Sequence, residues 1–195
     1  MKKAILIPTI SLFIICLVST IFLGVVNEIT EDKIAQNAVI TEAESQKKVM
    51  PDADSFGEKQ EGTYTYDGTS SAYSYVPALD KDKKTIGYVF ITESTGYGGA
   101  ISTMTGVDMN GKVTGVEFLE INETVGLGMN ANKDSFKEQF KGLVNGISVN
   151  KNTPGENEIK ALTGATITSK ATTKGVNTAL DIFENVLPYL GIEGK

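Results

Sequence analysis

The stretch that decides the fold is residues 100–121, AISTMTGVDMNGKVTGVEFLEI. Its two ends, residues 100–108 and 113–121, are rich in the β-branched and apolar side chains that favour strands. Between them lies DMNGK, in which Asn110 and Gly111 both tolerate the positive φ angles that tight hairpins require. The stretch therefore predicts two antiparallel strands joined by a hairpin.

The residues before this hairpin extend the same pattern. Residues 85–92, TIGYVFIT, are β-branched and aromatic and predict a third strand, and GYGG at 96–99 predicts a tight turn after it. Residues 62–77 mix Gly, Ser and Tyr, which indicates turns and short edge strands rather than a packed helix. The centre of the chain is thus expected to be an antiparallel meander.

Two helices are expected after the meander. Residues 133–143, KDSFKEQFKGL, place Phe136, Phe140 and Leu143 on one helical face and predict a short amphipathic helix packed on the sheet. After a polar loop at 150–157, residues 169–187 carry apolar side chains at helical spacing and predict a helix that closes the domain. The expected fold class is α+β, an antiparallel sheet with packed helices.

The N-terminus is expected to anchor the chain in a membrane. Residues 4–26 form a run of 23 residues without a charge, and at about 1.5 Å per residue such a helix crosses a hydrocarbon core of roughly 30 Å. A cleaved signal peptide is the alternative, but its apolar core is usually about 7–15 residues long. Lys2 and Lys3 predict a cytoplasmic N-terminus by the positive-inside rule.

Three parts follow from this reading. Residues 1–26 form the transmembrane anchor, and residues 27–50, polar and compatible with a helix, form a juxtamembrane stalk. Residues 51–195 form one domain, which a single-pass anchor with this orientation places outside the cytoplasm.

Composition excludes several functions. The 195 residues contain no His, no Trp and one Cys, Cys16, so the commonest ligands and nucleophiles of zinc sites, thiol catalysis and haem attachment are missing. All 18 basic residues are Lys, and the net charge of -6 disfavours binding to nucleic acid. No metal site and no catalytic residue is predicted.

The segment LTGATITS at 162–169 is the sharper of two candidate sites. It lies where a loop becomes a helix, and its small residues, hydroxyls and free amide groups at a helix N-terminus would suit a phosphate. From the residues alone, plain N-capping by Thr166, Thr168 or Ser169 is the favoured reading, because any globular helix can use it. A Walker-type phosphate loop is excluded, because Ser169 occupies the position of its second glycine.

The second candidate is ETVGLGM at 123–129, directly after a predicted strand. Gly126 and Gly128 bracket Leu127 and permit a sharp turn that presents an apolar side chain to a flat ligand such as an isoalloxazine ring. The alternative is an ordinary loop with a core leucine.

With these motifs the chain resembles the G subunit of Rnf complexes, the membrane-bound ion-translocating ferredoxin:NAD⁺ oxidoreductases. It is more distantly similar to the C subunit of the sodium-pumping NADH:quinone oxidoreductase. Three family motifs occur in order. The flavinylation motif [Ser/Thr]-Gly-Ala-Thr with a following apolar residue and Thr/Ser is residues 163–168, Gly-Tyr-x-Gly-Ala is 96–100, and Glu-Thr-Pro-Gly-Leu-Gly is 123–128 with Val125 replacing Pro.

The resemblance implies an electron-transfer subunit that is not catalytic alone and carries covalent FMN, esterified through its phosphate to Thr166. A separate flavin transferase that uses FAD and a divalent cation would attach it, and the other membrane and iron–sulfur subunits of the complex would be partners. Lys160 departs from the Asp that family members often carry three residues before the motif, which bears on transferase recognition. The remaining site residues that the resemblance implies are Thr163, Gly164, Ala165 and Thr168 of the motif and Glu123, Thr124, Leu127 and Gly128 around the flavin.

Three alternatives stay open at this point. The chain could be a C-type subunit of the quinone reductase, although those subunits are longer, or a solitary surface FMN carrier that feeds an external acceptor. It could also be a structural domain without flavin, in which residues 163–169 merely cap a helix.

Overall fold

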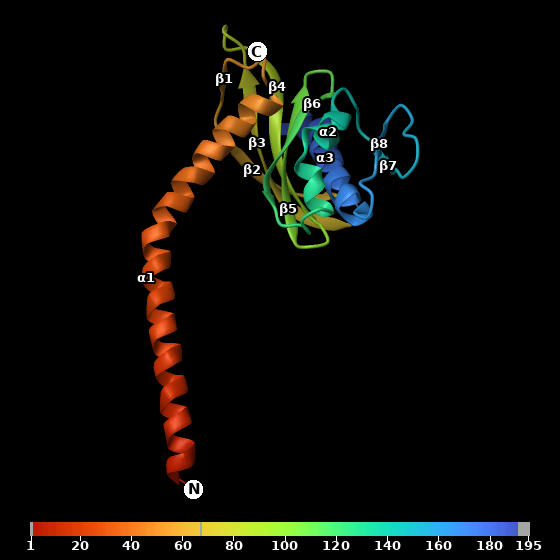
Figure 1. Cartoon of the computed structure of the whole chain (residues 1–195). Coiled ribbons are helices and arrows are strands. Elements are labelled where there is room, and N and C mark those ends of the chain that lie inside the picture. The colour runs from red at the N-terminus through yellow and green to blue at the C-terminus, as the bar shows by residue number, and fades with distance from the viewer. Residues whose placement is uncertain (1, 67, 191–195) are drawn as a thin grey trace. The chain divides into compact units, whose positions relative to one another are not determined.

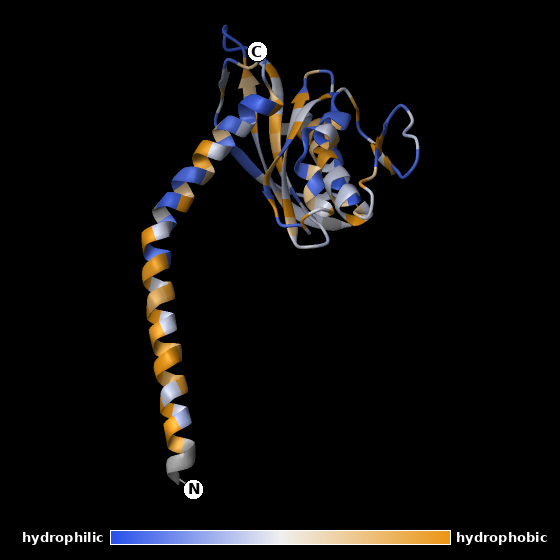
Figure 2. Ribbon diagram, viewed as in Figure 1, coloured by the Kyte–Doolittle hydropathy of each residue, from blue (hydrophilic) through white to orange (hydrophobic). Residues whose placement is uncertain are grey.

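The computed structural model describes residues 2–66 and 68–190, and the chain divides into two compact units, Met1–Thr41 and Glu42–Lys195. Helix α1, Lys2–Val49, supplies the first unit and the start of the second. It runs without a break through the predicted anchor and stalk. Its large apolar side chains from Leu6 to Val26 are exposed. Figure 2 colours most of this stretch as hydrophobic. Among the described residues, α1 is the one helix long and apolar enough to cross a membrane.

The second unit is built on an antiparallel sheet (Figure 1). Neighbouring strands follow the order β1-β3-β4-β5-β6, and β2 pairs with β3 off this path. The strands are β1 Ser55–Phe56, β2 Gln60–Tyr66, β3 Thr69–Leu79, β4 Thr85–Thr95, β5 Ala100–Asp108 and β6 Val113–Ile121.

The predicted hairpin is confirmed, with β5 and β6 at the expected bounds. Its turn is held by Asp108, whose Oδ1 accepts the backbone N–H groups of Asn110 at 2.8 Å and Lys112 at 2.9 Å. Only Gly111 adopts a positive φ, +74°, so the glycine alone supplies the left-handed residue of the turn. The predicted strand at 85–92 and the turn at 96–99 are confirmed as well.

The expectation of short edge strands over 62–77 was wrong for β3. This strand has 11 residues and pairs with β1, β2 and β4, so it lies inside the sheet. Its tyrosines alternate with smaller residues, and Tyr73 and Tyr75 enter the core on one face while Val76 packs on the other. The Gly and Ser residues of the segment weaken the alternation of apolar and polar side chains by which a strand is predicted from sequence.

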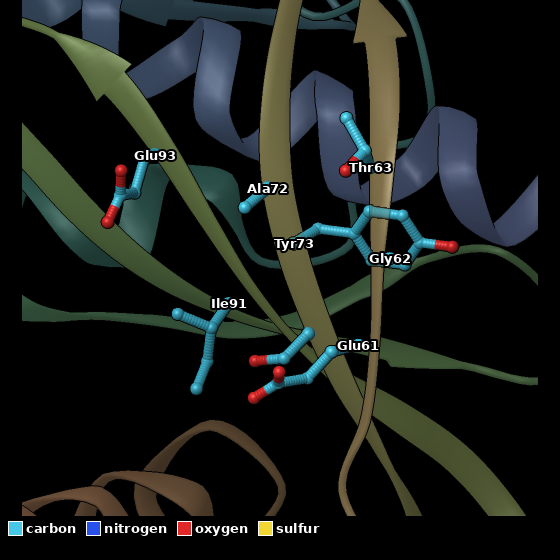
Figure 3. Close-up of a pocket in the computed structure, with 8 residues that line it drawn as sticks. Glu61, Gly62, Thr63, Ala72, Tyr73, Ile91 and Glu93 are labelled. Atoms are coloured by element: carbon cyan, nitrogen blue, oxygen red, sulfur yellow. The ribbon is translucent and has the colours of Figure 1, made fainter.

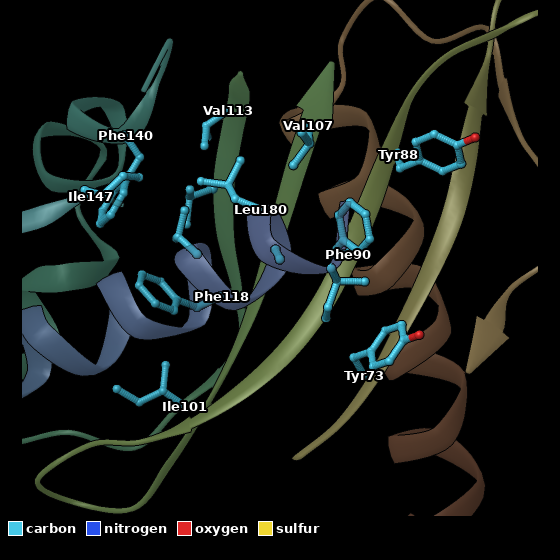
Figure 4. Packing of buried hydrophobic residues seen from close by; sticks show 14 of the residues in the cluster. Tyr73, Tyr88, Phe90, Ile101, Val107, Val113, Phe118, Phe140, Ile147 and Leu180 are labelled. Carbon is cyan, nitrogen blue, oxygen red and sulfur yellow. The ribbon is translucent and has the colours of Figure 1, made fainter. Parts of the chain in front are cut away.

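Helix α3, Thr166–Asn185, covers one face of the sheet and closes the main core. It begins three residues before the predicted start. The buried side chains include those of Phe90, Ile101, Phe118 and Leu180, which Figure 4 shows between strands and helix. Two short 3₁₀ segments, η1 Gly128–Asn132 and η3 Leu187–Leu190, also pack against α3.

The helix predicted at 133–143 is broken. It consists of α2, Asp134–Lys137, and the 3₁₀ segment η2, Glu138–Phe140, although Phe136 and Phe140 are buried together as predicted. The chain then turns at Gly142, with φ +79°, because the backbone of residues 142 and 143 bonds to that of Val113 on β6.

A two-stranded parallel sheet was not predicted. It consists of β7, Ser148–Asn150, and β8, Glu158–Lys160, on either side of the polar loop. Glu158 organises this loop by accepting hydrogen bonds from Ser148, Asn150 and the backbone of Gly155. Strands of three residues are too short to show a hydrophobic period.

The other face of the sheet packs against the end of α1. Val49 and Met50 are buried among Val76, Val89 and Met104. The paired residues Gly106 and Gly115 let the helix backbone approach closely, because a Cβ on Gly106 would lie 2.4 Å from the Val49 oxygen. The compact unit therefore begins within α1.

Strand β2 is tied to α3 by a hydrogen bond from the Tyr64 hydroxyl to the Asp181 carboxylate. This bond, aided by burial, raises the pKa of Tyr64 to about 12. Because the folded state holds the phenol proton more tightly than the unfolded state, the stabilisation is fully present below about pH 10 and is lost as the pH rises towards 12.

We therefore expect Tyr64→Phe to be less stable than the wild type at neutral pH, and the difference to shrink between pH 10 and 12. Urea unfolding of both proteins at several pH values measures it. Tyr73, Tyr75 and Tyr88 also have pKa values raised by burial, and they cancel in this comparison because both proteins retain them. A difference that stays constant up to pH 12 would contradict the assignment.

Candidate functional site

The two segments singled out from the sequence meet in one pocket, which we call the α3 pocket. Its cavity volume is about 560 Å³. Strand pairing places the 123–129 segment beside residues 96–99, the β4–β5 corner, because the end of β4, the start of β5 and the end of β6 lie at the same end of the sheet. Packing of α3 on β4 and β5 brings the 162–169 segment to Leu127, since a Cβ on Gly164 would lie 3.1 Å from the Leu127 Cδ2 atom. The lining residues are Tyr97, Glu123, Thr124, Leu127, Gly128, Gly164, Ala165, Thr166, Ile167 and Thr168.

Glu123 forms a wall of the α3 pocket and holds the β4–β5 corner. Its buried carboxylate accepts the backbone N–H groups of Tyr97 at 2.8 Å and Gly98 at 3.3 Å. A Cβ on Gly98 would lie 2.2 Å from the Asn122 backbone oxygen, so the corner requires a glycine there. The carboxylate thus positions the corner and is not a free acid in the cavity.

The segment after β6 is a rigid turn. The backbone oxygen of Thr124 accepts N–H groups from Leu127 and Met129, both at 3.1 Å, and the Asn130 side chain donates to the Gly126 oxygen at 2.8 Å. Leu127 lines the pocket and remains partly exposed, so it is not the core leucine of the alternative reading. Gly128 permits close packing, because a Cβ there would lie 2.6 Å from a Glu123 oxygen.

The turn at 124–127 has type II character, with Gly126 at φ +80° in the third position. Proline suits the second position, which Val125 occupies, and no hydrogen bond among the described residues uses the Val125 N–H. We expect Val125→Pro to raise the free energy of unfolding by about 0.4–1 kcal/mol, by restricting the unfolded chain. Urea denaturation measures this, and a destabilised variant would show that the position needs another φ.

The start of α3 forms the opposite side of the pocket. Its N-cap is Ala165, and no side chain caps the helix. Ser169 instead bridges the loop, accepting the Leu162 N–H at 2.9 Å and donating to the Ala165 oxygen at 3.0 Å. The alternative in which Thr166, Thr168 or Ser169 caps the helix is therefore not what the structure shows. The positive end of the helix dipole faces the pocket, because residues 166–168 line it. The first turn contains no acidic residue, so no carboxylate there offsets this positive end.

The three threonines near this helix start differ in access. Thr163 is exposed and lies outside the lining, whereas Thr168 lines the pocket but is 1% exposed. Thr166 both lines the pocket and is half-buried, so its hydroxyl alone of the three combines a place in the cavity with solvent access.

Eight of the nine predicted site residues thus line one cavity, and Thr163 does not. Tyr97 and Ile167 line it too, although neither was predicted from the sequence to be a site residue. Tyr97 stood in a family motif, and Ile167 was the apolar position of the attachment motif. Lys160 lies outside the lining, where its backbone N–H bonds to the Gln139 side chain at 2.8 Å.

A second hollow among the described residues of the domain lacks these features. Figure 3 shows this hollow on β2, β3 and β4, lined by Glu61, Thr63, Tyr73, Ile91 and Glu93 among others. No helix N-terminus opens on it. Within residues 2–66 and 68–190, no group of three or more Asp, Glu or Cys residues is placed to hold a metal ion.

Comparison with known proteins first defines the class. The FMN-binding domain family matches residues 96–181, a range that contains every lining residue of the α3 pocket. The fold is similar to that of the C subunit of the Na⁺-translocating NADH-quinone reductase from Parabacteroides distasonis. The TM-score is 0.52 at 19% identity, covering 71% of this chain and 80% of the other. The second unit is thus a domain of the FMN-binding class.

The family follows from relatives that match along most of their length. The G subunit of the proton-translocating ferredoxin:NAD⁺ oxidoreductase complex of Clostridium ljungdahlii is 40% identical over 89% of this chain and 88% of the relative. The G subunit of the Na⁺-translocating complex of Acetobacterium woodii is 32% identical over 90% and 89%. The RnfG N-terminal region matches residues 1–48. The chain belongs to the G-subunit family of Rnf-type ion-translocating oxidoreductase complexes.

Proposed function

We propose that the α3 pocket holds FMN, esterified through its phosphate to Thr166, and that the chain carries electrons within an Rnf-type complex. The observation that carries the proposal is the position of Thr166 at the uncapped start of α3, inside a cavity of about 560 Å³. The volume lies within the range of about 300–1,000 Å³ that is usual for cofactor sites.

The residues at the helix start suit a phosphodiester. Such a group keeps one negative charge, which the N-terminal end of α3 would stabilise by roughly 0.3–1 kcal/mol. Gly164, with φ +76°, and Ala165 carry little bulk and leave the backbone accessible. Thr163 would shape the loop before the helix from outside the cavity, and Thr168 would form part of the buried wall of the cavity. Glu123, Thr124, Leu127 and Gly128 would surround the flavin.

FMN would supply the redox chemistry, and the protein would hold it in place and set its surroundings. The domain contains no His and no Cys, so we assign no catalytic residue, and the chain is not expected to be catalytic alone. Glu123 would shape the pocket by holding the Tyr97 and Gly98 corner.

Maturation would need a separate flavin transferase. In that reaction the Thr166 oxygen forms a bond to the FMN phosphorus of FAD, the pyrophosphate bond breaks, and AMP leaves while the hydroxyl proton is released. Covalent attachment suits a domain outside the cytoplasm, where free FMN would be lost. Lys160, three residues before the motif, lies at the end of β8 and outside the pocket, so we propose that it bears on transferase recognition and not on flavin contact.

The proposed setting is the cell membrane, with α1 as a single span, Lys2 and Lys3 on the cytoplasmic side, and the FMN domain outside. The other membrane and iron–sulfur subunits of the complex would exchange electrons with it. Protease added to intact cells, after wall removal, should digest the domain. Complete protection until lysis would contradict the orientation.

Intact-protein mass spectrometry tests the cofactor directly. A chain coexpressed with a matching flavin transferase should carry the mass of one FMN ester and give a fluorescent band after denaturing electrophoresis. A chain of unmodified mass, with no fluorescent band, would favour the structural domain without flavin. A flavinylated chain that purifies without any other subunit from its native membrane would favour the solitary carrier.

A further inference from the structure

Four exposed apolar side chains lie at the α3 pocket or beside it. Tyr97, Leu127 and Ile167 line the pocket, and Val125 lies in the turn between the lining residues Thr124 and Leu127. We call these four residues the rim patch. The exposed fractions are 72% for Tyr97, 44% for Leu127, 54% for Ile167 and 88% for Val125. Single exposed apolar side chains are common on soluble domains, but neighbouring ones around a cavity mark interaction sites.

Val125 is the informative member of the rim patch. Its side chain does not line the α3 pocket, so a cofactor inside the cavity would leave it exposed. It stands at the tip of the turn that the Thr124–Leu127 and Asn130–Gly126 hydrogen bonds hold in place. A rigid turn presents an apolar side chain at little cost in conformational entropy on binding.

The charge distribution specifies the chemistry of what binds there. Glu123 is the only charged residue that lines the pocket, and its buried carboxylate is engaged by the β4–β5 corner. The chain as a whole carries a net charge of -6, yet the rim patch presents no charge to a partner. A complementary surface would therefore be apolar and uncharged, like the core of a protein–protein interface.

We propose that the rim patch is the docking surface for a redox protein with an apolar, uncharged contact face. The proposal rests on the proposed function, because a tethered flavin cannot diffuse to its reaction partner. The partner must reach the pocket mouth, gaining or losing one electron as the flavin loses or gains it, and the rim patch is the surface it meets there. The contact is small and transient, as weak redox encounters are.

A charge placed on the turn tests the proposal in the assembled, flavinylated complex. Val125→Asp should slow electron exchange between this flavin and its partner about tenfold, a change equivalent to about 1.4 kcal/mol. Flavin content and the flavin absorbance spectrum should stay unchanged. Stopped-flow absorbance of the flavin measures each rate.

Met109→Asp is the matched control, because Met109 is 50% exposed at the β5–β6 hairpin and is not part of the rim patch. It should react at the wild-type rate. Equal slowing in both variants, or a wild-type rate in Val125→Asp, would overturn the proposal. Loss of flavin from Val125→Asp would also overturn it, by assigning the residue to the cofactor pocket.

A photo-crosslinking residue at position 125 identifies the occupant independently of electron transfer. An adduct with another subunit of the complex is the expected result. An adduct with lipid or with a second copy of this chain would overturn the proposal. An unflavinylated wild-type chain that still crosslinks to another subunit would refute the proposed function while retaining the docking surface.

Discussion

Replacing Thr166 by Val is expected to abolish covalent flavinylation, so that fluorescence of the denatured band falls to background. The substitution removes the proposed acceptor oxygen with little change in volume. No hydrogen bond of the described structure uses the Thr166 hydroxyl, and it does not cap α3, so stability should change by less than about 1 kcal/mol. Coexpression with a matching transferase, followed by fluorescence and peptide mass mapping, measures the result.

Thr163→Val and Thr168→Val are the matched controls. Thr163 is exposed outside the pocket, and the Thr168 hydroxyl is buried against Gly128 and Glu123. Both variants should therefore keep the flavin on Thr166. A Thr166→Val chain that remains fluorescent, or an adduct on Thr168, would mean that the helix start opens to the transferase in another way.

The local parts of this fold could be predicted because their causes are local. The β5–β6 hairpin follows from strand-forming runs on either side of Asn110-Gly111, and the contacts that hold the turn come from Asp108 two residues away. The apolar face of α3 is similarly a pattern within one segment. Its start was missed by three residues because Thr166 to Thr168 have weak helix propensity, and tertiary packing overrides it.

The parts that could not be predicted depend on distant partners. β3 becomes an interior strand because β1, β2 and β4 pair with it, and the β7–β8 pairing joins segments on either side of a polar loop. The helix expected over 133–143 ends early because β6 captures its backbone at Gly142.

The candidate site shows the same division. Its two motifs could be found in the sequence because glycines and hydroxyls mark them. Their meeting in one cavity depends on the shared end of β4, β5 and β6 and on the packing of α3 against β4 and β5, which no single segment encodes. The role of Glu123 was also hidden, because its carboxylate bonds to backbone groups 25 and 26 residues away.

The second large effect concerns a buried ion pair between α2 and β6. The Lys137 ammonium lies 2.8 Å from a Glu117 oxygen and 3.2 Å from Asp134, with 9% of the Lys137 side chain and 16% of the Glu117 side chain exposed. Burial alone would lower the pKa of Lys137, but the hydrogen bonds with Glu117 and Asp134 outweigh it and the pKa is raised. The folded state therefore stabilises the charged lysine.

Lys137→Met is expected to lower the free energy of unfolding by about 3 kcal/mol, the lower end of the range for breaking a buried pair, because it leaves Glu117 charged without its partner. Adding Glu117→Leu should recover much of that loss. Lys141→Met is the control: Lys141 lies 4.0 Å from Glu138, both side chains are exposed, and its removal should change stability by less than about 0.5 kcal/mol.

The contribution of the Lys137 pair to stability also depends on pH. Because the folded state raises the Lys137 pKa above its ordinary value of 10.5, this stabilisation is present below that pH and is lost as the pH rises through the folded value. Urea unfolding of the full-length chain in detergent, followed by near-ultraviolet circular dichroism, measures all three variants. Equal losses in Lys137→Met and Lys141→Met would show that Glu117 is solvated when its partner is removed.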